Sequence, residues 1–445
     1  MEEIKQLLEE KKINLLRERL NELNSVDISI ILQELDEQVD KDKLLIVFRI
    51  LSKEKAGEAF TYLEPDMQEK LIHNLTDKEL KNVINELYMD DTVDLLEEMP
   101  SNVVKRILKN VNQQDRVTIN ELLKYPEDSA GSIMTTEFVD LKENMTVEDA
   151  LNRIRKTGLE KETIYYCYVL STKRNLIGAV DLKRIVVSEK DALIKDLMET
   201  NVIKVNTLED KENVAKALSK YNFLAIPVVD NEDKLVGIVT VDDAIDVIQD
   251  ETTEDLEKMA AIAPSEESYF STGTFKHAKN RIVWLLILML SSTITGAIIT
   301  KYENAFAAIP LLVSFIPMIM GTGGNCGAQS STLIIRGLAT DEVETKDVLK
   351  VIWKEIRVAI VVGLALAILN GLYIMIRYRN PMLSLTLGLT LMLTVVLAKL
   401  IGCCLPLLAK KLKLDPALMA SPLITTIVDT CSVLIFFNVA TMIML

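Results

Sequence analysis

The chain has 445 residues, of which 65 are acidic and 50 basic, and a formal net charge of −15. The charge is uneven, because residues 1–280 carry 57 acidic and 37 basic side chains while residues 281–445 carry only 8 and 13. Since phosphate backbones select Lys and Arg, the acidic part argues against nucleic acid as a partner and favours cations. Two histidines, and five cysteines without a CxxC pair, argue against a zinc site or a disulfide framework.

Residues 1–125 repeat apolar positions at three- and four-residue steps, with breaks expected at Gly57, Pro65, Pro100 and Pro126. This pattern predicts short helices, and loosely similar segments predict an all-α superhelix of stacked hairpins. The first residues lack the apolar core of a signal peptide, so we expect a cytoplasmic N-terminus.

Residues 126–190 and 191–250 repeat one pattern, in which a strand, a polar turn, a glycine-containing strand and a helix follow one another. The runs TIYYCYVL and FLAIPVVD begin the two copies of that pattern. The duplication predicts an α/β module. It resembles a tandem pair of CBS domains (a Bateman module), most clearly in IPVVD and LVGIVTVDDA between Ile226 and Ala244. Such modules sense adenine nucleotides or ions.

Residues 251–280 read as an acidic connecting helix, and residues 281–445 as an all-α membrane domain, since each apolar stretch approaches the length that spans a bilayer. Lys and Arg at the ends of these stretches number eleven on one side and three on the other. This bias predicts an N-terminus inside and a C-terminus outside. The five predicted spans are Ile282–Thr300, Ala305–Leu338, Glu355–Tyr378, Leu383–Ala409 and Ala417–Leu445.

The last span contains one ionisable residue, Asp429. A carboxylate in hydrocarbon is costly, so it either marks a functional site or pairs with a basic group on another helix. Thr426, Thr425 and Pro422 precede it by three, four and seven residues and therefore share its helix face. Oxygen ligands thus lie on the same stripe as the charge.

The second span contains two prolines and four glycines, which predict a break in the helix at mid-membrane. Backbone carbonyls freed there would line a water-filled path, and Asn325 would add a polar side chain. The alternative is a close contact between helices, which glycines permit. These residues are Pro310, Pro317, Gly321, Gly323, Gly324 and Gly327.

Two segments, GTGGNCGAQSSTLIIRGLA (Gly321–Ala339) and LDPALMASPLITTIVD (Leu414–Asp429), resemble the signature segments of MgtE-type magnesium channels. The order of parts agrees along essentially the whole chain, and eukaryotic solute-carrier magnesium transporters are similar more distantly. The resemblance implies a homodimer in the cell (inner or plasma) membrane, with one pore between the subunits. A hydrated Mg²⁺ would be held by both copies of Asp429, with Thr425 and Asn325 nearby and Asp415 at the pore mouth. Co²⁺ and other divalent ions are further candidates.

The cytoplasmic acids receive a second role. In VDDAIDVIQDETTEDLE, carboxylates at three- and four-residue steps repel one another, and a divalent ion between such faces would remove that repulsion. The resemblance implies that Mg²⁺ bridges the N-terminal, CBS and connecting-helix acids and closes the pore; the alternative for each acid is a solvated helix face. The candidates are Asp90, Asp91, Asp94, Glu212, Asp243, Asp246, Asp250, Glu251, Glu254 and Asp255.

The stretch GIVTVDD resembles the CBS segment that contacts phosphate and ribose, which makes Thr240 and Asp243 candidates for ATP binding. Three positions depart from the family pattern. Asn222 stands where an acid is usual, and Cys326 where a small polar residue is usual. Lys399 lies inside the fourth span, where it would pair with a polar group, extend toward the interface or tune the charge of the pore.

The expected function is a Mg²⁺-selective, Mg²⁺-gated channel for magnesium uptake. A carrier that exchanges a divalent cation for H⁺ or Na⁺ is one alternative, and a membrane-anchored CBS nucleotide sensor without transport is another. We expect no enzymatic activity, because no catalytic triad, Walker motif or histidine–metal cluster is recognisable in the sequence.

Overall fold

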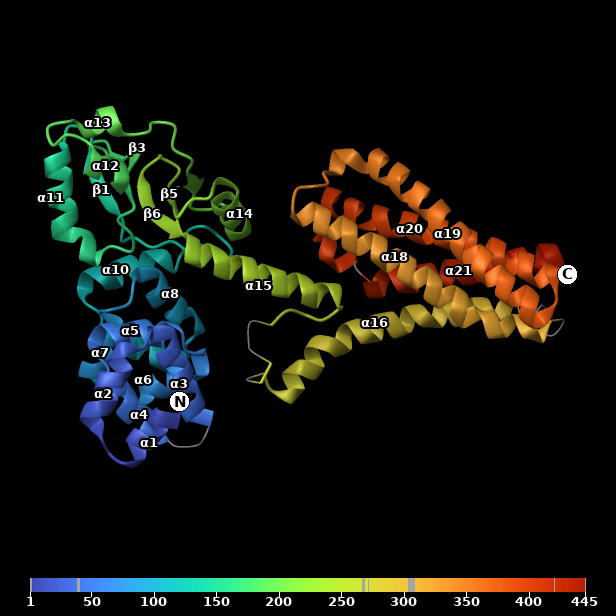
Figure 1. Ribbon diagram of the computed structural model, residues 1–445, viewed down its shortest axis with the longest axis horizontal. Coiled ribbons are helices and arrows are strands. Elements are labelled where there is room, and N and C mark those ends of the chain that lie inside the picture. Colours follow the sequence, from blue (N-terminus) through green and yellow to red (C-terminus); the bar gives the residue numbers. More distant parts are fainter. Residues whose placement is uncertain are drawn as a thin grey trace. The chain divides into compact units, whose positions relative to one another are not determined.

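The computed structural model describes residues 2–37, 41–265, 269–270, 272–302, 309–419 and 421–444. The chain divides into two compact units, Met1–Gln249 and Asp250–Leu445. Figure 1 labels their helices and strands where there is room. The predicted start of the second span at Ala305 and the predicted end of the fifth at Leu445 lie outside the described residues.

The first unit begins with ten short helices, as the three- and four-residue periodicity predicts. Pro65 is the first residue of α6, and Pro100 is the N-cap of α9, so both act as the predicted breaks. Gly57 does not break a helix, because it lies inside α5, where the side chain of Glu86 covers its Cα. The ten helices are α1 (Glu2–Glu9), α2 (Ile13–Glu22), α3 (Ser25–Glu37), α4 (Lys41–Ile50), α5 (Lys53–Thr61), α6 (Pro65–Asn74), α7 (Asp77–Ile84), α8 (Met89–Glu98), α9 (Ser101–Asn110) and α10 (Gln113–Leu122).

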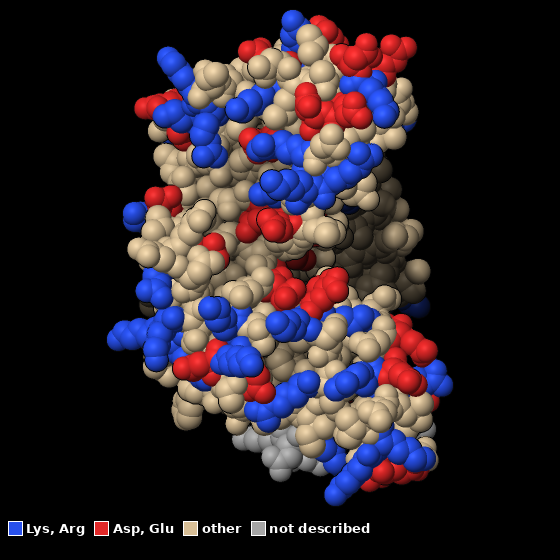
Figure 2. Space-filling view, turned by 90° about the vertical axis from the view of Figure 1, so that its left-hand side faces the viewer, with Lys and Arg blue, Asp and Glu red and all other residues tan. Residues whose placement is uncertain are grey.

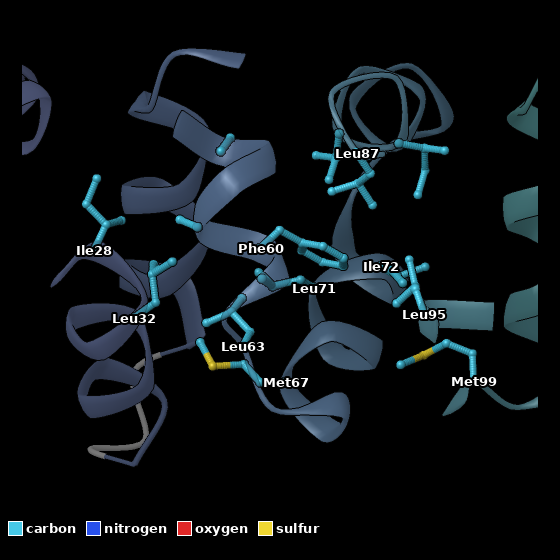
Figure 3. Packing of buried hydrophobic residues seen from close by; sticks show 14 of the residues in the cluster. Ile28, Leu32, Phe60, Leu63, Met67, Leu71, Ile72, Leu87, Leu95 and Met99 are labelled. Carbon is cyan, nitrogen blue, oxygen red and sulfur yellow. The ribbon is translucent and has the colours of Figure 1, made fainter. Parts of the chain in front are cut away.

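The apolar faces of these helices meet in one continuous core. Phe60, Leu71 and Ile72 are fully buried in it, and Leu32 packs there from α3 (Figure 3). Burying each such side chain stabilises the fold by about 1.5–3 kcal/mol. The same cluster includes Val228 of the second CBS copy. The helical array and this copy therefore form one packed body.

The CBS copies each contain a three-stranded sheet of the same topology. The orders are β1-β2-β3 and β4-β5-β6, and in each sheet the first pair is parallel and the second antiparallel. This identity confirms the predicted duplication. The elements are β1 (Val139–Lys142), α11 (Val147–Thr157), β2 (Tyr166–Leu170), β3 (Leu176–Asp181), α12 (Leu182–Val187), α13 (Ile194–Leu197), β4 (Val205–Asn206), α14 (Lys211–Tyr221), β5 (Ala225–Val229) and β6 (Leu235–Thr240).

Charges of both signs cover the face of the molecule shown in Figure 2. Acidic side chains gather in a recess across the middle of that face, with basic side chains above and below it. On this face the acidic side chains are therefore grouped rather than evenly spread.

The helix α15 (Val241–Met259) is continuous from the end of the second CBS copy into the region read as a separate connector. Residues 260–265 are not helical, and α16 (Thr274–Lys301) begins the membrane part. The connecting helix is thus the end of α15, and it begins before residue 251.

The second unit holds five helical segments that are long and apolar enough to cross a membrane, as the sequence predicts. Within it, α18, α20 and α21 pack directly against one another, and α19 packs on α20 (Figure 1). The segments contain α16, α18 (Ile316–Ala339), α19 (Val348–Tyr378), α20 (Pro381–Lys411) and α21 (Ser421–Met444).

The predicted break inside the glycine-rich part of the second span is wrong. Only Pro310–Phe315 form a 3₁₀ turn, and α18 then runs without interruption through all four glycines. Its backbone groups are satisfied within the helix, which hydrocarbon demands. The glycines permit close helix packing instead, which was the alternative interpretation.

Candidate ion-binding sites

Asp429 lies in the middle of α21 and is half-buried. In the described part of the chain its carboxylate makes no hydrogen bond and no ion pair, so the alternative of a basic partner on another helix finds no support. Helix α18 approaches this carboxylate, since a Cβ placed on Gly324 would lie 3.1 Å from Thr425 Cγ2 and 3.5 Å from Asp429 Oδ1. Glycine at position 324 thus brings the backbone of α18 against the Thr425–Asp429 face.

A polar stripe runs along the side of α18 that packs against no other described helix. Asn325 and Gln329, one helical turn apart, are both exposed, and neither side chain forms a hydrogen bond within the described residues. Polar side chains in a membrane helix are rarely left facing lipid. The stripe and the half-buried Asp429 therefore form a face that is unfavourable against lipid and favourable against a polar partner or water.

Three glycines hold α18 in this place. A Cβ on Gly323 would strike Ser432 and Thr394, and one on Gly327 would strike Ile424. From the other side, a Cβ on Gly402 of α20 would overlap the carbonyl oxygen of Gly327. The backbones of α18 and α20 are therefore in direct contact next to Asn325.

Lys399, the unexpected cation of the fourth span, is buried and pairs with Glu355 of α19, with Nζ 3.6 Å from Oε2. Ser330 of α18 donates a 2.6 Å hydrogen bond to the same carboxylate oxygen and accepts one of 3.2 Å from Lys399. The predicted third span begins at Glu355, but α19 begins two turns earlier, at Val348. Three helices thus meet at one buried ion pair, which selects the first of the three interpretations of Lys399.

Asp415, predicted at the pore mouth, lies just before α21 and accepts a 2.7 Å hydrogen bond from Lys258 near the end of α15. Lys258 also pairs with Glu254 at 2.6 Å. Burial would lower the pKa of Lys258, but the two carboxylates outweigh burial and raise it. A single lysine therefore ties the end of the connecting helix to the last membrane segment.

The predicted regulatory acids of the helical array do approach the second CBS copy. Asp90 of α8 is 6% exposed, and burial, followed by repulsion from Asp243 of α15 and from Asp91, raises its pKa. Two acids that the sequence reasoning missed join them, Glu137 and Glu162 of the first CBS copy. Oε2 of Glu162 is buried and finds no hydrogen-bond partner among the described residues.

Burial and repulsion between neighbouring carboxylates raise the pKa of five members of this cluster, Asp90, Asp91, Asp94, Glu162 and Asp243. Burial chiefly raises the pKa of Asp91 to about 6, that of Asp243 to about 7 and that of Glu162 to about 8. It raises the pKa of Asp90 well above its usual value. Burial, followed by repulsion from Asp243, also raises the pKa of Asp94. Water reaches the exposed side chain of Asp94 and screens part of this repulsion. Near neutral pH the cluster is therefore only partly ionised, and the negative charge that it does carry is unfavourable.

The remaining predicted acids lie on two helices, α14 and α15. Glu212, in the first turn of α14, pairs with Lys216 at 2.6 Å and, within the part of the chain that the structure describes, forms no hydrogen bond or ion pair with the cluster. Five acids follow one another along α15: Asp246, Asp250, Glu251, Glu254 and Asp255. Within the described ranges, no three or more Asp, Glu, His or Cys side chains have the spacing of a preformed metal site.

The two predicted nucleotide-binding residues, Thr240 and Asp243, contact each other. The hydroxyl of Thr240 donates a 2.5 Å hydrogen bond to Asp243 Oδ2 at the start of α15.

The structure explains why asparagine occupies position 222. Asn222 ends α14 in the left-handed conformation with φ 53°. Asn tolerates that conformation better than most residues. Its presence therefore reflects helix termination.

Comparison with protein families supports the helical array, the CBS pair and most of the membrane part. Residues 316–439 match the family model described as MgtE, divalent cation transporter. Residues 23–128 match the MgtE intracellular N domain, and residues 130–190 and 194–250 match CBS domains. All four regions of the family thus occur in the expected order.

Among similar proteins, the Magnesium transporter MgtE of Thermus thermophilus is 35% identical over 98% of this chain and 97% of its own length. The Magnesium transporter MgtE of Bacillus subtilis is 34% identical over 98% of this chain and 95% of its own. Both relatives are matched over nearly their full length.

Two solved structures resemble the first unit. The soluble part of a magnesium transporter is 33% identical, with a TM-score of 0.52, and covers 56% of this chain and 96% of its own. The cytosolic domain of the Mg²⁺ channel MgtE in complex with ATP is 34% identical, with a TM-score of 0.52, and covers 55% and 98%. With five membrane-length helical segments after an N-terminal helical domain and a CBS pair, this chain belongs to the MgtE family of magnesium transporters.

Proposed function

We propose that this chain is a Mg²⁺-selective channel for magnesium uptake, in which two copies enclose one pore between their α18 and α21 helices. The observation that carries the proposal is the partnerless carboxylate of Asp429, within the described residues, beside the exposed polar stripe of α18. In a dimer this face would no longer meet lipid. Asp429 of each subunit would face the other across the path.

The chemistry of this face suits Mg²⁺. Mg²⁺ sheds water reluctantly and is usually held through one or two carboxylates with several waters retained. Two Asp429 carboxylates would supply charge, and Asn325 would orient bound water. The membrane potential would drive entry by about 2.3 kcal/mol per charge per 100 mV.

The test is uptake by the full chain. Proteoliposomes with an internal Mg²⁺-sensitive dye should show Mg²⁺ entry driven by potential alone, and planar bilayers should show single-channel currents. A strict requirement for a proton or sodium gradient would contradict a channel and indicate a carrier. If no Mg²⁺ flux occurs and cells deficient in magnesium uptake are not rescued for growth, the channel is contradicted. The alternative of a membrane-anchored CBS nucleotide sensor without transport would then be favoured.

Cytosolic Mg²⁺ closes the pore in this proposal by relieving the repulsion within the acidic cluster. The buried, unsatisfied oxygen of Glu162 and the approach of Asp90 to Asp243 support it. Since no preformed metal site exists among the described residues, Mg²⁺ would act through its bound waters or draw the carboxylates closer. Lys258, between Glu254 and Asp415, would carry the change to the membrane part. ATP is a further proposed ligand, at Thr240 and Asp243.

Neutralising Asp90, Asp94 and Asp243 as Asn is expected to remove closure by Mg²⁺ while leaving uptake intact. Repulsion between the helical array and the second CBS copy no longer needs a cation to offset it. The measurement is Mg²⁺-dependent protection of the full chain from a protease, together with uptake at rising internal Mg²⁺. Protection should become independent of Mg²⁺.

A matched control removes three exposed acids from the first CBS copy, as Glu143→Gln, Glu189→Gln and Asp191→Asn. This control should keep Mg²⁺-dependent protection. Equal loss in both triple variants would show that bulk charge, and not the cluster, controls closure.

A further inference from the structure

The first CBS copy contains a cavity of about 470 Å³ between the edge strand β1 and the hairpin that joins β2 to β3. Its lining includes three cationic residues, Lys142, Lys161 and Arg174, and the hydroxyl residues Ser171 and Thr172 of the hairpin. Small-molecule sites in proteins commonly enclose about 300–1,000 Å³. The cavity is therefore large enough for a molecule of nucleotide size.

The three cations are unpaired. In the described part of the chain, the side chains of Lys142, Lys161 and Arg174 form no hydrogen bond and no ion pair. The acid in the lining, Asp140, is already paired with Arg153. The cavity thus concentrates unpaired positive charge in a strongly acidic unit, which favours an anionic ligand.

The second CBS copy provides an internal comparison. Lys142 pairs with Leu170 across the parallel strands as Asn206 pairs with Val229, and both sheets shift register at that point. Following the hairpins from there, Arg174 corresponds to Asp233. Both residues have the left-handed conformation, with φ 67° and 63°.

In the second copy both of these positions have partners within the same copy. Asp233 forms a 2.7 Å ion pair with Lys204, and Asn206 donates a 3.1 Å hydrogen bond to Asn231. The equivalent positions of the first copy hold two cations, Lys142 and Arg174. Among the described residues, neither of these side chains has a partner of that kind. Because the two folds match in register, the difference lies in the side chains, and it points to an external partner for the first copy.

We propose that this cavity binds a phosphate-bearing small molecule. Lys142, Lys161 and Arg174 neutralise the phosphate, since charge-assisted hydrogen bonds are the strong ones. Ser171 Oγ accepts from the backbone N–H of Asn175 at 3.1 Å, so its own proton is free to donate. The site is independent of the Mg²⁺ transport proposed above and lies outside the Thr240–Asp243 pair.

Ligand binding here would affect both copies, because the hairpins are joined. The backbone N–H of Leu235 donates to the carbonyl of Arg174 at 3.2 Å, and that of Leu176 to the carbonyl of Asp233 at 3.1 Å. The Asn175 amide also donates to the carbonyl of Glu232 at 2.7 Å. A phosphate held by Arg174 would therefore stiffen the junction between the two copies.

The test is equilibrium binding to the purified full chain in Mg²⁺-free buffer, with inorganic pyrophosphate and AMP as separate probes. The double variant Lys142→Gln/Arg174→Gln should weaken binding by at least about tenfold, because two charge-assisted contacts are lost. Both side chains are exposed at the cavity mouth, so the variant should fold normally, which thermal melting checks.

The matched control, Lys173→Gln/Lys183→Gln, removes two exposed cations of the same copy that do not line the cavity. Control binding should equal that of the wild type. Tight binding of pyrophosphate alone would identify an inorganic phosphate, and tighter binding of AMP a nucleotide. The proposal is overturned if neither probe binds, or if the cavity variant and the control lose affinity equally.

Discussion

Replacing Asp429 with Asn is expected to lower Mg²⁺ uptake about a hundredfold or more while the protein stays folded. The amide keeps the shape of the side chain but removes one negative charge from each subunit. A hydrogen bond to a charged group contributes about 1.5–3 kcal/mol, so two lost carboxylates weaken ion occupancy by about 3–6 kcal/mol in all. Each 1.4 kcal/mol corresponds to about a tenfold change in binding.

The measurement is dye-reported Mg²⁺ entry into proteoliposomes, normalised to the folded protein in each membrane. Asn438→Ala supplies the control, since Asn438 lies on the same helix and is exposed. That variant should transport at the normal rate. Wild-type uptake by Asp429→Asn would remove Asp429 from the ion path and with it the proposed pore.

Replacing Lys399 with Met is expected to destabilise the membrane domain by about 3–5 kcal/mol, because Glu355 is left buried without its cation. Glu355→Gln should harm stability in the same way by isolating Lys399. The double variant Lys399→Met/Glu355→Gln should recover most of the loss, since a neutral pair of similar volume needs no compensation. Ser330 would still donate to the Gln carbonyl oxygen.

Thermal melting of the full chain in detergent measures these effects, and uptake reports the position of α18 independently. Lys354→Met serves as the control, because Lys354 is adjacent in sequence to Glu355 but exposed. Its melting temperature should not change. If Lys399→Met melts like the wild type, or if the double variant is no better than the single ones, the buried ion pair does not hold the three helices together.

The parts of the fold that follow from local patterns could be predicted from the sequence. The helix periodicity before residue 125, the repeated strand–turn–strand units and the membrane-length segments all depend on residues close together in the chain. Helix ends were harder, as Gly57 and Glu355 illustrate. Both lie inside helices because tertiary packing, and not local preference, decides where those helices begin and end.

The parts of the candidate sites that depend on distant pairs could not be predicted. Lys399 and Glu355 are separated by 44 positions, and nothing in either segment signals the other. Glu162 follows a short 3₁₀ turn in the first CBS copy, and only the tertiary fold brings it near Asp91 and Asp243. The predicted break in the glycine-rich segment is wrong for a related reason. Glycine permits both a helix break and a close helix contact, and only the neighbouring helices decide between them.

The contact between Gly402 and Gly327 has a consequence for tolerance to mutation. Where one backbone carbonyl faces the Cα of a glycine on the next helix, a weak Cα–H···O hydrogen bond can take the place of side-chain packing. Even alanine at position 402 would push the two backbones apart, close to Asn325. In a saturation screen for growth on low magnesium, Gly402 should therefore be as intolerant as Asp429, although it has no side chain with which to bind an ion.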